Sequence, residues 1–229
     1  MAPTIKHRYN PLYSSAETEK LVRSLPTAAH LYELVNTFLS SHLGTSKTIL
    51  IANSGGINEI KALQISNPTW QMAVYQPDDA ATSENESSNQ SDQFSVSVLS
   101  SLLLDDSTDQ LYDGAFCNLL LHFLDNETKL KLLKSISSHL KSGSPFVLVT
   151  LTGDRTEPEF DRQLEAWKMN LDKSNGIPTN NSEAEANQVK TLPLVTQGTL
   201  SKLLEDSGFE QSTLFYATYF CRGWVLLKR

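Results

Sequence analysis

Short apolar runs alternate with amphipathic stretches along most of the chain. Apolar runs bounded by turn-forming residues predict buried strands at 47–52, 70–75, 94–99, 112–117 and 146–151. Apolar positions at helical spacing predict helices at 57–65, 125–140 and 159–171, and two further helices over 16–42 with a break at Pro26. Strands that alternate with helices in this way form a parallel sheet with helices on both faces.

The C-terminal part follows a different pattern. A last helix is predicted at 199–207 with Gly208 as its C-cap, and two aromatic-rich strands follow at 211–219 and 223–227. The short link at 220–222 joins these strands as an antiparallel hairpin. Polar stretches at 78–93 and 172–187 are predicted to be loops. The whole pattern predicts one α/β domain with a mostly parallel, seven-stranded sheet.

Composition agrees with a folded domain and narrows its class. The 229 residues are 39% apolar and 20% charged, which is typical of globular proteins. The net charge is −7, and Lys129, Lys131 and Lys134 are expected on the solvated face of one helix, so nucleic-acid binding is disfavoured. We expect neither a signal peptide nor a membrane span, hence a cytoplasmic protein. The only two cysteines, Cys117 and Cys221, are predicted to be buried free thiols, and no metal site is expected.

Two segments carry a resemblance to a known family. YDGAFCNLLLHFLDNETKLKLLKSISSHLKSGSPFVLVTL, at 112–151, resembles the fourth strand, helix, glycine turn and fifth strand of class I S-adenosylmethionine (SAM)-dependent methyltransferases. LLEDSGFEQSTLFYATYFCRGWVLLK, at 203–228, resembles the helix and hairpin that close many small-molecule methyltransferases. The resemblance covers most of the chain. It implies a Rossmann-like methyltransferase fold as one domain over 1–229, with an N-terminal helical cap at 1–44 and a substrate-cap insert at 152–195.

The resemblance also implies SAM as the cofactor, bound beyond the carboxyl ends of the strands. The expected cofactor contacts follow the first four strands and are Asn53, Ser54, Gly55, Gly56, Tyr75, Gln76, Ser100, Ser101 and Asn118. The family's acidic-x-Gly-x-Gly-x-Gly pattern keeps one glycine in register, Gly55, and has Ile51 at its acid position. Tyr75 and Gln76 stand where the family has a ribose-binding acid, and serines stand where it has an adenine-binding acid. These three positions therefore depart from the family's pattern.

Methyl transfer mainly requires that the reactants be held close and in line. A base is needed only where the acceptor must lose a proton, and His122 is the candidate for that role. A structural role under the helix is the competing interpretation and the more frequent one for a lone histidine. The residues expected to contact substrate are Tyr9, Tyr13, Phe123, Trp167, Tyr219 and Arg222. The resemblance implies that the first two fold over the site as an N-terminal lid.

Two functions remain open on the sequence. The first is SAM-dependent methyl transfer to a small-molecule acceptor, which the insert and the hairpin favour. The second is a catalytically inactive, methyltransferase-like scaffold that binds a partner, which the three missing acids favour. A protein partner or a homodimer is compatible with either.

Overall fold

The structure is a computed structural model that describes residues 24–25, 27–45, 47–53, 57–75, 96–99, 110–175 and 180–229. The loop predicted at 78–93 lies outside the described residues, as does most of the helix predicted before Pro26.

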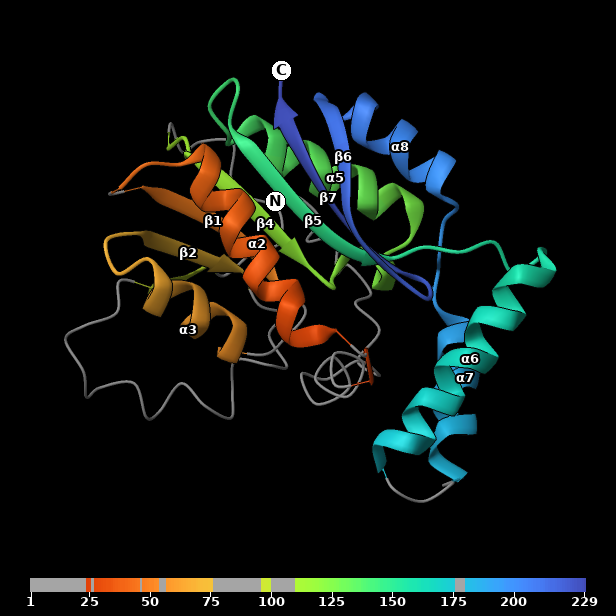
Figure 1. Ribbon diagram of the computed structural model, residues 1–229. Coiled ribbons are helices and arrows are strands. Elements are labelled where there is room, and N and C mark those ends of the chain that lie inside the picture. Colours follow the sequence, from red (N-terminus) through yellow and green to blue (C-terminus); the bar gives the residue numbers. More distant parts are fainter. Residues whose placement is uncertain are drawn as a thin grey trace, which may run out of the picture.

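Seven strands form a single sheet in the order β3-β2-β1-β4-β5-β7-β6 (Figure 1). The first five are parallel and are β1 (Thr48–Asn53), β2 (Gln71–Tyr75), β3 (Val96–Leu99), β4 (Gly114–Asn118) and β5 (Pro145–Leu151). The hairpin of β6 (Phe209–Thr218) and β7 (Cys221–Lys228) follows, with β7 antiparallel to β5. The predicted mostly parallel, seven-stranded sheet with a C-terminal hairpin is confirmed.

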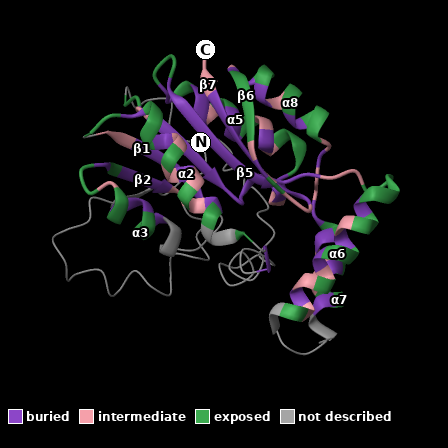
Figure 2. Cartoon of the chain, in the orientation of Figure 1, coloured by how far each residue is buried: buried purple, intermediate pink, exposed green. Residues whose placement is uncertain are grey.

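Helices cover both faces of this sheet. α2 (Ala28–His42) and α3 (Ile57–Ser66) lie on one face, and α5 (Asn126–Ser138) and α8 (Gln197–Asp206) lie on the other (Figure 1). Strand side chains alternate between the two faces. In β1, Ile49 and Ile51 belong to the core cluster that contains α2, whereas Leu50 and Ala52 belong to the cluster that contains α5 and α8. The central strands are buried on both faces (Figure 2).

Local signals place the helix ends as expected. Asp125 caps α5 by accepting a hydrogen bond from the Thr128 amide at 2.8 Å. Gly208 follows α8 with a φ of +86°, a conformation that costs a residue with a side chain, so its predicted role at the helix C-terminus is confirmed.

The loop predicted at 172–187 is wrong. α6 (Pro158–Asn175) continues into this range, and α7 (Asn180–Thr191) occupies most of the rest. Two of the three apolar residues of α7, Ala186 and Val189, are three apart, and both are buried in the core cluster that contains α6. Lys168 of α6 also pairs with Glu183 of α7 at 2.5 Å. This largely polar segment is therefore helical because it packs against a neighbouring helix.

The expectation for the two cysteines is confirmed. Cys117 and Cys221 are both buried and unpaired, as predicted, and burial raises the pKa of each thiol to about 12. Within the described ranges, no helix is both long and apolar enough to cross a membrane.

Candidate functional site

The strand order reverses between β1 and β4, and two asparagines stand at that point. Asn53 and Asn118 end these strands and are partners in the ladder register. The Asn118 Nδ2 donates to the Asn53 Oδ1 at 3.1 Å and to the Tyr32 hydroxyl of α2 at 3.3 Å. The structure therefore brings together two of the predicted cofactor residues at the switch point of the sheet, the place where open α/β sheets generally bind ligands.

The carbonyl oxygen of Asn118 is the most informative atom of this pair. The Asn118 side chain is only 1% exposed, and its Oδ1 has no hydrogen-bond partner among the described residues. A buried acceptor left unpaired costs about 1–3 kcal/mol. Such a group at the carboxyl edge of the sheet could be satisfied by a ligand that donates a hydrogen bond.

Backbone strain lies directly beside it. Leu119 has a φ of +47°, which a bulky side chain rarely adopts, and its amide is held by the Val149 carbonyl of β5 at 2.8 Å. Strain of this kind costs about 1–3 kcal/mol and clusters at functional sites. Here it turns the chain from β4 towards the 3₁₀ helix η1 (Leu121–Phe123).

The remaining predicted cofactor contacts are less well placed. Tyr75 ends β2, pairs in register with Ala52 and is half-buried. Ile51, at the family's acid position, is fully buried in the core. The predicted residues outside the described ranges are Tyr9, Tyr13, Ser54, Gly55, Gly56, Gln76, Ser100 and Ser101.

His122 lies in η1 and is buried. Its Nδ1 accepts a hydrogen bond from the Leu151 amide at 3.4 Å and lies 3.2 Å from the Thr150 hydroxyl, so the ring proton belongs on Nε2. That Nε2 is buried without a partner among the described residues. Burial, aided by the nearby Lys129 charge, lowers the pKa of His122 to about 3. The imidazole is therefore neutral at physiological pH, and its predicted role as a base stays a prediction.

The position of the Lys129 side chain differs from the expectation. Lys129 was expected on the solvated face of α5, but its side chain is buried, and its Nζ donates to the carbonyls of Leu124 at 2.5 Å and Pro193 at 2.6 Å. Lys131 and Lys134 are exposed, as expected. Burial lowers the pKa of Lys129 to about 8, against a smaller opposing effect of Asp125. Lys129 thus ties the start of α5 to the segment that follows α7.

The predicted substrate residues separate into two places. Trp167 of α6 is fully buried, packs edge-on against Phe220 and donates from its Nε1 to the Ser24 hydroxyl at 2.6 Å. Phe123 is partly buried beside His122, with ring centroids 4.2 Å apart. Their predicted contacts with substrate remain predictions.

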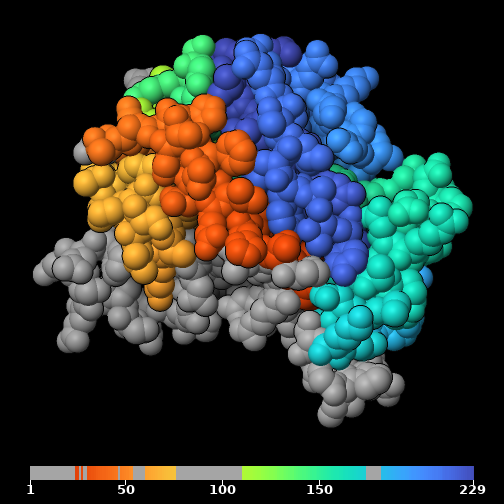
Figure 3. Space-filling model, in the orientation of Figure 1, coloured from red at the N-terminus to blue at the C-terminus, as the bar shows by residue number. Residues whose placement is uncertain are grey.

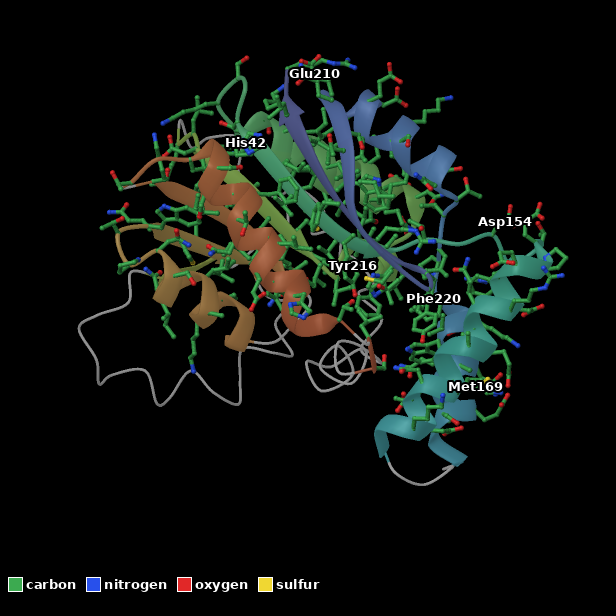
Figure 4. The ribbon with its side chains drawn as sticks, in the orientation of Figure 1. His42, Asp154, Met169, Glu210, Tyr216 and Phe220 are labelled. Atoms are coloured by element: carbon green, nitrogen blue, oxygen red, sulfur yellow. The ribbon has the colours of Figure 1, made fainter. Side chains whose placement is uncertain are left out.

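Tyr219 and Arg222 lie at the turn of the β6–β7 hairpin. Phe220, at the same turn, points towards α6 (Figure 4). Together with residues of α6, Tyr219 and Arg222 line a surface hollow of about 350 Å³. The structure therefore brings these two predicted substrate residues together, at the same sheet edge as the asparagine pair.

Comparison with known proteins identifies the fold. No family model and no curated protein matches the sequence significantly. Solved structures do match. An O-methyltransferase family protein from Burkholderia thailandensis is 14% identical and aligns with 93% of this chain at a TM-score of 0.60. Human N-acetylserotonin methyltransferase in complex with SAM is 15% identical over 93% of the chain, at a TM-score of 0.54. Magnesium protoporphyrin IX methyltransferase from Synechocystis, with bound S-adenosylhomocysteine (SAH), is 10% identical over 87%, at 0.56.

The chain has the class I methyltransferase fold. The predicted resemblance is thereby confirmed at the level of the fold. The chain spans 58% of the Burkholderia protein, 56% of the human enzyme and 82% of the Synechocystis enzyme. Within this fold, the Asn53–Asn118 pair occupies the switch point of the sheet.

Three residues of the site were missed by the sequence analysis. Tyr32 and Ser24 meet their partners across 86 and 143 residues of chain, and no local pattern marks such contacts. Thr150, which faces His122, is the one polar residue in an apolar strand, and that break in the pattern was a usable signal.

Proposed function

We propose that this protein transfers a methyl group from SAM to a small-molecule acceptor. The methyltransferase fold supports the reaction class, and the neighbours with SAM, SAH or apigenin bound support a cofactor and a small acceptor of this kind. The unpaired Oδ1 of Asn118 at the switch point is the observation that carries the proposal.

The described residues fit the cofactor at this position. SAM bears an ammonium and an aromatic amino group, both of which donate hydrogen bonds, and Asn118 offers a buried acceptor that needs a donor. Asn53 and Tyr32 fix the Asn118 side chain in place, so little conformational entropy is lost when a ligand binds. When bound, SAM supplies a methyl group on a positively charged sulfur, and the transfer is an in-line displacement.

The chain's own contribution is to position the reactants. We assign His122 to this task rather than to proton transfer, because the lone pair on its Nδ1 already accepts from the Leu151 amide. The ring thereby holds the carboxyl end of β5 against η1. Asn118 lies just before the strained Leu119, so rigid structure surrounds the buried acceptor on both sides.

A pair of matched variants tests the proposal. Asn118→Leu removes the unpaired acceptor, and we expect SAM affinity, measured by equilibrium dialysis, to fall about tenfold, the effect of one hydrogen bond to a charged donor. The control is Gln64→Met. Gln64 is also a buried amide with an unpaired oxygen, but it bonds to the Trp70 carbonyl, just before the amino end of β2.

The control variant should bind SAM as the wild type does, since it lies at the opposite edge of the sheet. Equal SAM affinity in both variants would contradict the assignment of Asn118. Comparable thermal midpoints for the two variants ensure that a loss of binding is not a loss of fold.

A further inference from the structure

The hollow between α6 and the β6–β7 hairpin is separate from the asparagine pair. Neither Asn53 nor Asn118 lines it. It lies at the carboxyl end of β5, because Arg222 pairs in register with Thr150. The end of the hairpin and α6 meet at the surface here (Figure 3). Its volume of about 350 Å³ is at the lower end of the range for small-molecule sites.

Arg222 is fixed in this hollow by its own backbone neighbourhood. Its Nη1 donates to the carbonyls of Cys221, at 2.9 Å, and Tyr219. These two bonds occupy both hydrogens of Nη1. The Nε and Nη2 hydrogens, which form the side-on edge of the guanidinium, have no partner among the described residues. This edge is one that binds a carboxylate or phosphate with two parallel hydrogen bonds.

The positive charge of Arg222 is not neutralised. The side chain is partly buried, and no described carboxylate lies within ion-pairing distance of it. Burial lowers its pKa, against a smaller opposing effect of Cys221. Burial raises the pKa of the Cys221 thiol to about 12, so this thiol is uncharged at neutral pH and supplies no counter-ion. A partly buried charge without a counter-ion is unfavourable, and an anion placed against it relieves the cost.

The other charged groups of the hollow largely satisfy one another. Glu159 accepts from Arg162 at 3.5 Å and from the Gln163 Nε2 at 3.4 Å. Two arginines and one glutamate leave the hollow with a net charge of +1, in a chain whose net charge is −7. Tyr219 adds an aromatic ring to the lining, so the hollow combines a cationic edge with an apolar surface.

We propose that this hollow binds a small molecule through a carboxylate or phosphate group, which the side-on edge of Arg222 holds. The aromatic side of the hollow accommodates a planar or apolar body attached to that anionic group. This site does not depend on SAM binding, so its test stands apart from the test of the proposed function.

The test uses benzoate and phenyl phosphate as probes, with benzamide as the uncharged analogue. We expect saturable shifts of the Arg222 Nε–H signal in NMR titrations with at least one anion, and none with benzamide. The anion that binds more tightly shows whether the hollow prefers a carboxylate or a phosphate. The Arg222 variants lack the Nε–H signal, so their binding is compared with that of the wild type through the backbone amide signals of Ala217 and Tyr219, which also line the hollow. Arg222→Met should weaken binding at least about tenfold, as expected when a two-bond ionic contact is lost.

Arg155→Met is the matched control. Arg155 is an exposed arginine outside the hollow, so this variant loses the same charge and should bind the anions as the wild type does. Arg222→Lys keeps a positive charge but lacks the two-bond edge, and should also bind about tenfold more weakly. If Arg222→Met does not fold, Arg222→Lys serves as the test variant in its place. Absence of saturable binding to the wild type, or equal binding to the wild type and the Arg222 variant, would overturn the proposal.

Discussion

The buried ammonium of Lys129 predicts an unusual pH dependence of stability. Its folded pKa is about 8, whereas a lysine in an unfolded chain titrates near 10.4. Between these values the unfolded state binds more protons than the folded state, so the free energy of unfolding rises with pH. The neutral amine keeps N–H donors for the carbonyls of Leu124 and Pro193, so both hydrogen bonds survive deprotonation.

The size of this effect follows from the pKa shift. The difference between the folded and unfolded pKa corresponds to a change of about 3 kcal/mol in the free energy of unfolding. Because water has partial access to the ammonium, we expect a change of about 2 kcal/mol. His122 does not add to the change, because its pKa of about 3 keeps it neutral throughout this range. Asp125, the acid near Lys129, is likewise ionised throughout, since its pKa is lowered by its bonds to Thr128.

Urea unfolding of the wild type and of Lys129→Met, at several values from about pH 7.5 to about pH 10, measures this effect. The difference in unfolding free energy between the two proteins should shift by about 2 kcal/mol in favour of the wild type as the pH rises. Lys134→Met, which removes an exposed lysine from the same helix, should show no such shift. A constant difference for Lys129→Met, or a shift in the other direction, would refute the reasoning.

Three further predictions concern packing and protonation. Gly153→Ala places a Cβ 2.6 Å from the Phe160 ring, so the free energy of unfolding, measured in urea, should fall by about 1–3 kcal/mol. An unchanged free energy of unfolding would contradict this tight contact. Trp167→Phe and Ser24→Ala should each lower the free energy of unfolding by about 1 kcal/mol. The double variant should lower it by less than the sum of the two, because both substitutions remove the same hydrogen bond. Nitrogen NMR should find His122 neutral, with its proton on Nε2, from about pH 5 to about pH 8; an imidazolium in that range would be inconsistent with its burial.

Much of the fold was predictable because strand and helix leave different periodicities in the sequence. Most of the apolar run at 47–52 lies in β1, where the side chains at 49–52 alternate between the two core clusters. The segment at 172–187 was not predictable in the same way. Its helix is stabilised by a neighbouring helix that buries Ala186 and Val189, and such tertiary contacts leave only a weak local pattern.

The burial of Lys129 has a signal in the sequence. Lys129 precedes Leu132, Leu133 and Ile136 by three, four and seven residues, which places it on the apolar stripe of α5. A charged residue on such a stripe means either that the helix face is wrongly predicted or that the charged group is buried with polar partners. Its partners here are backbone carbonyls, one of them 64 residues away. Every residue has such a carbonyl, so the sequence does not indicate which ones accept these bonds.

The candidate site was only partly accessible to sequence reasoning. The approach of Asn53 and Asn118 is predictable from the sequence, because each follows a predicted strand and parallel strands bring their carboxyl ends to one edge. The unpaired Oδ1 of Asn118 and its contact with Tyr32 depend on side-chain geometry, so they emerge only from the structure.

Equilibrium dialysis of the wild-type protein against radiolabelled SAM, with SAH as competitor, tests the central claim most directly. The proposed function predicts saturable binding of one SAM per chain with a Kd on the order of micromolar, and displacement of SAM by SAH. A folded protein that binds no SAM would contradict the proposed methyl transfer and would favour a methyltransferase-like scaffold that binds a partner.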